Sequence, residues 1–205
     1  AQWDRPYGPM GVNSGYALAA MRHAHEFGTT DAQRAKVAVD QRTNACANPA
    51  SLFSGTPITI DDVLASPVIC DPLHLLEIVM PCSGAAAFVV ARDDVARAAP
   101  HPPVRLRGFG EHVTHSSLAS MPDLTRTRIV ESAARAFAMA GAGPGDVDLV
   151  SVYDCYTITV ILTLEDAGFC EKGSGGPFVA DHDLTFAGDL PAVRVRDLGG
   201  LAAGR

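Results

Sequence analysis

The chain has 205 residues, a formal net charge of −7 and a hydrophobic content of 47%, which suits a globular protein with a packed core and argues against disorder. Its acidic residues are scattered and no stripe of Lys and Arg is present, so nucleic acid is not an expected partner. The longest apolar runs are too short to cross a bilayer, and the first residues carry no signal-peptide pattern, so no membrane span is expected.

The first hundred residues are predicted to be mainly helical. A start rich in Gly and Pro is followed by apolar residues at helical spacing, and Gly28 can end that first helix. Thr29, Thr30 or Asp31 can cap the next helix. The expected segments of this part are helices at 16–27, 32–48 and 61–65 and a short apolar stretch at 73–79.

The rest of the chain is predicted to alternate strands with helices. A Pro-rich break at 100–103 separates the two parts, and the order of elements implies a layered α/β fold. After Gly168 the chain is predicted to be loop, with GSGG at 173–176 as a flexible turn. The expected strands are 84–91, 103–112 and 148–153, and the expected helices are 93–99, 124–140 and 157–168.

The cysteines and histidines do not form a metal-binding pattern. Five widely spaced cysteines without a CxxC pair indicate reduced thiols of a cytoplasmic protein rather than a disulfide framework or a zinc site. His23 and His25 lie two residues apart on a helix and cannot share a face. With His112 and His115, they are expected to be solvated surface residues, and no metal site is predicted.

One cluster of titratable side chains lies between a predicted buried strand and a predicted buried helix: Tyr153, Asp154, Cys155 and Tyr156. A tyrosine at such a turn can point its hydroxyl into a pocket, or can pack in the core with the hydroxyl bonded to backbone. Asp154 is expected to cap the following helix or bond a backbone amide, and Cys155 to be a buried structural thiol. Tyr153 is therefore the first catalytic candidate, and Tyr156 the second.

Three segments carry a family resemblance. They are YALAAMRHAHEFGTT with AKVAVDQRTNACANP, then ITIDDVLASPVICDPLHLLEIVMPCSGAAAFVVA, and then DVDLVSVYDCYTITVILTLEDAGFCEKGSGGPFV. Together they resemble the thiolase superfamily, and within it the sterol-carrier-protein-type thiolases and the lipid-transfer-type steroid side-chain aldolases. In the third segment Tyr153 and Tyr156 stand where such relatives read the H and F of H-D-C-F. Cys82, in the second, lies in a part that the family uses structurally.

The resemblance implies a layered αβα thiolase-like fold, of which this chain looks like the loop domain plus most of the C-terminal half. Residues 1–99 would be the loop domain and the last strand and helix of the N-terminal half, and residues 100–205 an incomplete C-terminal half. The segments with the family's nucleophilic cysteine and its G-H-P histidine are expected to fall outside this chain. Half of such a fold would leave wide apolar faces uncovered.

The resemblance also implies chemistry on acyl-CoA thioesters, in which a carbon–carbon bond beside the thioester is made or broken. Claisen chemistry needs an acyl-carrying cysteine, whereas retro-aldol cleavage needs only a base and an acid. Tyr153 and Tyr156 could supply these if nearby groups lower their pKa from its ordinary value of about 10. Met10, Arg22 and His25 are the implied contacts of coenzyme A, which enters as the substrate thioester.

Two alternatives remain open at this point. The protein could be a conventional acetyl-CoA acyltransferase whose cysteine lies on another segment, or a thiolase-like scaffold without catalysis. The implied partners are the acyl-CoA substrate, a second copy in a homodimer, and a small acyl-CoA-binding protein with a zinc ribbon and an OB-fold barrel.

Overall fold

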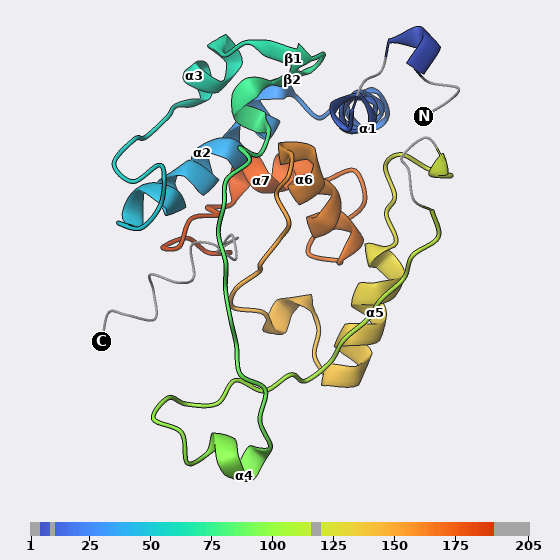
Figure 1. Ribbon diagram of the computed structural model, residues 1–205. Helices are drawn as coiled ribbons and strands as arrows, with labels where there is room; N and C mark the ends of the chain where they lie inside the picture. Colours follow the sequence, from blue (N-terminus) through green and yellow to red (C-terminus); the bar gives the residue numbers. More distant parts are fainter. Residues whose placement is uncertain (1–4, 9–10, 116–119, 191–205) are drawn as a thin grey trace.

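The computed structural model describes residues 5–8, 11–115 and 120–190, so the predicted contact Met10 lies outside the described residues (Figure 1). The helices are η1 (Arg5–Tyr7), α1 (Asn13–Phe27), α2 (Asp31–Ala47), α3 (Ile60–Ala65), η2 (Leu75–Glu77), α4 (Asp93–Ala96), α5 (Ile129–Ala140), η4 (Pro144–Asp146), α6 (Thr157–Asp166) and α7 (Gly175–Asp181). The strands β1 (Val68–Cys70) and β2 (Leu73–His74) pair antiparallel.

The first three predicted helices are confirmed as α1, α2 and α3, and their ends follow local chemistry. Gly28 adopts a left-handed conformation, with φ of 76°, and its N–H bonds Ala24 O at the end of α1. Of the three possible caps for α2, Thr30 takes the role: its side chain accepts from Gln33 N–H, while the Gln33 side chain accepts from Thr30 N–H.

Helix α6 forms the centre of the core, as its apolar sequence predicts. Ile158, Val160, Ile161 and Leu164 are all fully buried. The helix contacts α1, α2, α5 and α7, so it holds together elements that are far apart in the sequence (Figure 1). Its first residue directly follows the tyrosine-containing cluster, which is therefore anchored to a helix whose side chains are mostly buried.

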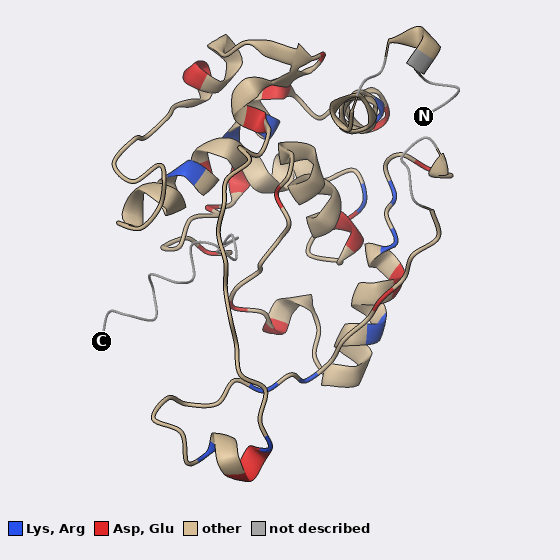
Figure 2. Ribbon diagram, in the orientation of Figure 1, with Lys and Arg blue, Asp and Glu red and all other residues tan. Residues whose placement is uncertain are grey.

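The three predicted strands differ from expectation. Segments 84–91, 103–112 and 148–153 run as extended chain but do not form strands (Figure 1). A strand is defined by the neighbours it bonds; in the described part of the chain 84–91 and 103–112 have none, and 148–153 has only a single bridge residue, Val150. The uncharged stretch from Ile78 to Ala91 shows as a plain ribbon in Figure 2, whereas charges are spread over the helices.

Helix α7 was not expected, because GSGG was predicted to be a flexible turn. Gly175 and Gly176 instead form the first turn of α7 and are buried. A Cβ on Gly175 would lie 2.6 Å from Glu165 Oε1, and one on Gly176 would lie 2.5 Å from Gln33 Oε1. The glycines therefore allow α7 to pack closely against α6 and α2.

No helix within the described ranges is long and apolar enough to cross a membrane. The proposed division of the chain near Pro100 stays a prediction.

Candidate functional site

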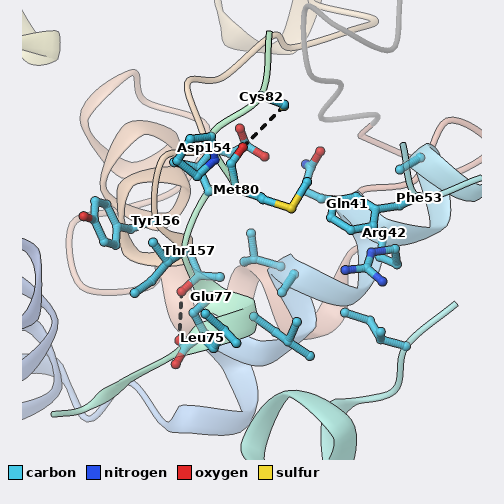
Figure 3. A pocket seen from close by; sticks show the side chains of 18 of the residues that line it. Gln41, Arg42, Phe53, Leu75, Glu77, Met80, Cys82, Asp154, Tyr156 and Thr157 are labelled. Carbon is cyan, nitrogen blue, oxygen red and sulfur yellow. Dashed lines mark hydrogen bonds between the residues drawn. The ribbon is translucent and has the colours of Figure 1, made fainter. Parts of the chain in front are cut away.

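A pocket of about 650 Å³ lies between α2, the loop after it, the chain that follows η2, and the start of α6. Figure 3 shows Tyr156, Thr157 and Asp154 on one side of it and Gln41, Arg42 and Phe53 on the other. Its wall is mostly apolar. The aliphatic and sulfur-containing side chains that line it include Val37, Leu52, Ile58, Val79, Met80 and Cys82. This is the usual composition of a small-molecule site.

Tyr156 is the predicted catalytic residue that the structure places in this pocket. It is only 3% exposed, and its hydroxyl donates a hydrogen bond of 2.5 Å to Asn13 Oδ1. Its ring stacks on Tyr16 with centroids 4.1 Å apart. The side chain is thus held between the first turn of α1 and the start of α6.

The electrostatics of this tyrosine differ from the expectation of a lowered pKa. Burial, reinforced by the nearby thiol of Cys155, raises the pKa of Tyr156 above its ordinary value. The same causes raise the pKa of Tyr16 to about 12. Tyr156 is therefore a neutral phenol at physiological pH, which suits a hydrogen-bond or proton donor and not a base.

Tyr153 takes a different position from Tyr156. It is 77% exposed and does not line the pocket, whereas its neighbour Val152 is buried. Such alternation of buried and exposed side chains is typical of an extended chain that is covered on one face. The structure therefore brings Tyr156 to the pocket without Tyr153, and the catalytic role of Tyr153 stays a prediction.

The other members of the cluster have distinct surroundings. Cys155 is buried, in keeping with a structural thiol, and its Sγ lies 3.7 Å from Thr159 Oγ1. Asp154 lines the pocket beside Tyr156. The residue that precedes α6 is Tyr156, so Asp154 is not the cap of that helix. Cys82 also lines the pocket, as an exposed thiol whose Sγ bonds Met80 O at 3.4 Å.

A buried ion pair between Arg34 and Glu77 lies beside the site and was not predicted from the sequence. Glu77 lines the pocket and accepts hydrogen bonds from Arg34 Nε at 3.0 Å and from Thr157 Oγ1 at 2.9 Å. Arg34 is fully buried on α2. Glu77 therefore ties α2 to the first residue of α6, next to Tyr156. The one signal in the sequence was Glu77, a single acidic residue in the apolar stretch LHLLEIV, whereas Arg34 is one of several charged residues of α2.

The prediction of a solvated His23 is wrong. His23 is fully buried, with Nδ1 2.8 Å from Thr29 Oγ1 and Nε2 3.0 Å from both oxygens of Glu165. Glu165 also accepts from Lys172 and from the N–H of Gly175. Burial opposes ionisation of this carboxyl, but the bonds from His23 and Lys172 prevail and lower the pKa of Glu165. The network joins α1, α6 and the start of α7.

The predicted coenzyme A contacts on α1 lie away from the pocket wall. Arg22 pairs with Glu26 on an exposed face of α1, and the His25 side chain is also exposed. Neither lines the pocket. A basic side chain that does line it is Arg42, which donates to Thr56 O and lies 4.0 Å above the ring of Phe53. Across the described ranges, no three His, Cys, Asp or Glu residues are grouped as metal ligands.

Comparison with known proteins identifies the chain's relatives. Residues 110–203 match the family described as thiolase C-terminal domain-like. The chain is 39% identical over 203 residues to an acetyl-CoA acetyltransferase of Methanothermobacter thermautotrophicus, covering 98% of this chain and 52% of that protein. It is 32% identical over 199 residues to a steroid side-chain-cleaving aldolase of Thermomonospora curvata, covering 92% of this chain and 50% of that protein.

A solved structure gives the same result for the fold. The Ltp2–ChsH2(DUF35) aldolase superposes with a TM-score of 0.82 at 29% identity, over 93% of this chain and 51% of that one. The chain thus spans about half the length of the relatives it matches. The predicted thiolase-like α/β fold is confirmed, and the chain belongs to the thiolase superfamily.

Proposed function

We propose that this chain forms one side of an acyl-CoA site at which a carbon–carbon bond next to the thioester is cleaved by retro-aldol chemistry, with a lipid or steroid side chain as the acyl group. The observation that supports this most directly is Tyr156, a buried neutral phenol on the wall of an apolar pocket. A phenol of this kind can donate a proton to an enolate but cannot carry an acyl group as a thiolate does.

The proposed reaction consists of two proton transfers and the cleavage of one carbon–carbon bond. A base removes the proton of the β-hydroxyl, the bond between Cα and Cβ breaks, and Cβ leaves as a ketone or aldehyde. The electron pair remains on Cα as the enolate of the thioester, which an acid then protonates. Tyr156 is proposed as that acid, because its raised pKa keeps it protonated. Tyr153 is proposed as the second group of the pair, and a partner surface must then bring it to the substrate, since it is exposed.

Conventional acetyl transfer is the second candidate. It is favoured by the 39% identity to a protein named acetyl-CoA acetyltransferase, which exceeds the 32% identity to the aldolase. In this case an acyl-carrying cysteine would come from outside the chain, and the tyrosines would only shape the pocket. A third candidate is a scaffold that binds no thioester.

The proposed partners follow from the same relatives. The Ltp2–ChsH2(DUF35) aldolase is named for two components, Ltp2 and ChsH2, which supports an equivalent small acyl-CoA-binding protein here. We also propose a homodimer and a cytoplasmic location. Arg22 and His25 remain proposed contacts of coenzyme A, and Arg42, at the far end of the pocket, joins them as a candidate.

Free coenzyme A separates these candidates. The protein that carries this chain is incubated with a β-hydroxyacyl-CoA whose acyl group is the side chain of a steroid. The incubation is run with and without added coenzyme A. Retro-aldol cleavage yields a ketone and a shorter acyl-CoA in both cases, because no thiol is consumed. A β-ketoacyl-CoA is tested in parallel. If the β-ketoacyl-CoA is cleaved only when coenzyme A is added, and the β-hydroxyacyl-CoA is not cleaved, the activity is acetyl transfer instead. Failure to bind any acyl-CoA would leave the scaffold.

A further inference from the structure

Asn13, the first residue of α1, is committed to the site rather than to its own helix. Asparagine often caps a helix N-terminus, yet the residue at the cap of α1 is Val12, and no side chain bonds there. The Asn13 side chain instead reaches a residue 143 positions away, where its Oδ1 accepts from the Tyr156 hydroxyl at 2.5 Å. Both residues line the pocket. The amide of Asn13 is therefore placed to act on Tyr156.

A second residue on the same face of α1 holds the ring of this tyrosine. Tyr16 lies three positions after Asn13, so both side chains project from one face of the helix. The Tyr16 ring stacks on that of Tyr156, with centroids 4.1 Å apart, and the Tyr16 hydroxyl is hydrogen-bonded to Cys155. Helix α1 thus fixes the ring of Tyr156 with one side chain and its hydroxyl with the other. The ring can stay in place while the hydroxyl proton turns about the C–O bond.

The hydroxyl of Tyr156 has one proton, and that proton lies in the bond to Asn13. A phenol donates one hydrogen bond, so this bond must break before the proton can pass to a substrate. The transfer then leaves a phenolate. Burial and three ionisable neighbours raise the pKa of Tyr156 and so make this charge unfavourable. The neighbours are Cys155, Tyr153 and Cys70.

The surroundings of Tyr156 indicate which group can stabilise such a phenolate. The three ionisable neighbours are thiols and a phenol, from β1 and from the chain before α6, and Tyr16 adds a phenol from α1. Asp154, which also lines the pocket, is acidic (Figure 3). None of these side chains carries a positive charge. Asn13 differs from them, because its amide has two N–H donors beside the carbonyl oxygen and does not ionise.

We propose that Asn13 is a positioning residue that changes its role in the reaction: it accepts the hydrogen bond of the Tyr156 hydroxyl before proton transfer and donates an amide N–H to the phenolate oxygen afterwards. The two ends of the amide are alike in shape, so a half turn of the group exchanges them. The proton passes from Tyr156 Oη to Cα of the enolate, and the O–H electron pair stays on Oη. After the product leaves, solvent returns a proton to Oη and the amide turns back.

The energetics favour this exchange of roles. The bond from an amide N–H to a phenolate is charge-assisted and is about twice as strong as the neutral bond that it replaces. Asn13 therefore offsets part of the effect of burial on Tyr156 at the moment when the proton is given up. The enolate as proton acceptor rests on the proposed function, whereas the exchange of hydrogen bonds concerns Asn13 and Tyr156 alone.

A purely anchoring role for Asn13 makes the opposite prediction. A group that only accepts stabilises the neutral phenol, so its removal should lower the pKa of Tyr156. A group that also donates to the phenolate stabilises the anion more strongly than the phenol, so its removal should raise that pKa. The direction of the change on removing the amide therefore separates the two roles.

The test uses difluorotyrosine, with a fluorine on each side of the hydroxyl, at position 156 of the protein that carries this chain. The fluorines lower the pKa of the phenol well below its ordinary value of about 10, so it titrates while the protein is folded, and their NMR signal reports this position alone. We expect a higher pKa in Asn13→Leu than with Asn13 in place. Asn13→Ala gives the same comparison if Asn13→Leu does not fold.

The matched control is Ser14→Ala, at the next position of α1, which should leave the titration unchanged. A pKa in Asn13→Leu that is equal to or lower than that with Asn13 in place would overturn the proposal. An equal rise in Ser14→Ala would also overturn it, because the effect would then belong to the helix start in general.

Single-turnover cleavage of a β-hydroxyacyl-CoA gives a second readout. Asn13→Leu should be at least about tenfold slower, with thioester binding changed by no more than about threefold, because Asn13 acts through Tyr156. In a Tyr156→Phe background the same substitution should slow cleavage no further. A tenfold loss that persists in that background would overturn the link between the two residues. A protein that cleaves no β-hydroxyacyl-CoA would refute the proposed function, while the fluorine titration would still decide the role of Asn13.

Discussion

Tyr156 and Tyr16 stack with an interplanar angle of 23° and ring centroids 4.1 Å apart, beside the buried thiol of Cys155. Burial and the nearby Cys155 side chain raise the pKa of both phenols, because a phenolate there would lack solvation and would lie beside other ionisable groups. The pair is therefore neutral until strongly alkaline pH, and this state is what makes Tyr156 suitable as a proton donor.

The alkaline stability of the protein tests this state. The pKa of Tyr16 is raised to about 12, from 10.0. The contribution of Tyr16 to the unfolding free energy is therefore complete below about pH 10. It is lost as the pH rises toward 12, because Tyr16 ionises at a lower pH in the unfolded chain than in the folded protein. We expect Tyr16→Phe to weaken this pH dependence in urea unfolding, and Tyr7→Phe, at an exposed tyrosine, to leave it unchanged. Identical pH dependence in Tyr16→Phe and the unsubstituted protein would contradict the account.

The His23–Glu165 pair makes a prediction at acid pH. The pKa of Glu165 is lowered from 4.5. Its contribution to the unfolding free energy is therefore present above pH 4.5 and is lost as the pH falls below that value. Glu165→Gln should lower the unfolding free energy by about 3 kcal/mol at about pH 7. It should also reduce the loss of stability at acid pH, the acid limb of the curve of unfolding free energy against pH. Glu171→Gln, at an exposed carboxylate, serves as the control. A stable Glu165→Gln protein with an unaltered acid limb would show that the network contributes little.

The close contact of α7 with α6 predicts a cost for a single methyl group. In Gly175→Ala the new Cβ would meet Glu165 Oε1 at 2.6 Å and Ile161 Cγ2 at 2.7 Å. We expect a loss of about 1–3 kcal/mol, measured as a lower urea midpoint, as for other overpacked sites. Gly145→Ala is the control, since nothing lies within 4 Å of its Cβ. A Gly175→Ala midpoint no lower than that of Gly145→Ala would contradict this packing.

Helices were more predictable from this sequence than strands, for a physical reason. The bonds of a helix are local, so the apolar period and the Thr30 cap were sufficient to place α1 and α2. A strand depends on its neighbours, and segments 84–91 and 103–112 have none among the described residues. The strand prediction described the apolar character of these segments correctly but could not supply their partners.

The site was only partly predictable. The motif at 153–156 identified the turn, but the choice between Tyr153 and Tyr156 depends on which side chain faces the pocket, and the structure places Tyr156 there. Asn13 and Glu77 could not be found from the motif, because they lie 143 and 80 residues away from their partners Tyr156 and Thr157. His23 was misassigned because helical spacing alone does not reveal its contact with Glu165.

The role of Tyr153 is tested by Tyr153→Phe in the protein that carries the chain. If Tyr153 belongs to the acid–base pair, retro-aldol turnover should fall by about 100-fold, while the unfolding free energy changes little, because the side chain is exposed. Turnover equal to that of the unsubstituted protein would remove Tyr153 from the mechanism and leave the base to be found elsewhere.

The most direct measurement is single-turnover cleavage of a β-hydroxyacyl-CoA by Tyr156→Phe, with thioester binding measured in parallel. The phenylalanine retains the ring that stacks on Tyr16 and loses only the hydroxyl that bonds Asn13. If Tyr156 donates the proton, cleavage should be at least about 100-fold slower in this variant, with thioester binding changed by no more than about threefold. Cleavage at the unsubstituted rate would contradict the claim that Tyr156 is the proton donor of this site.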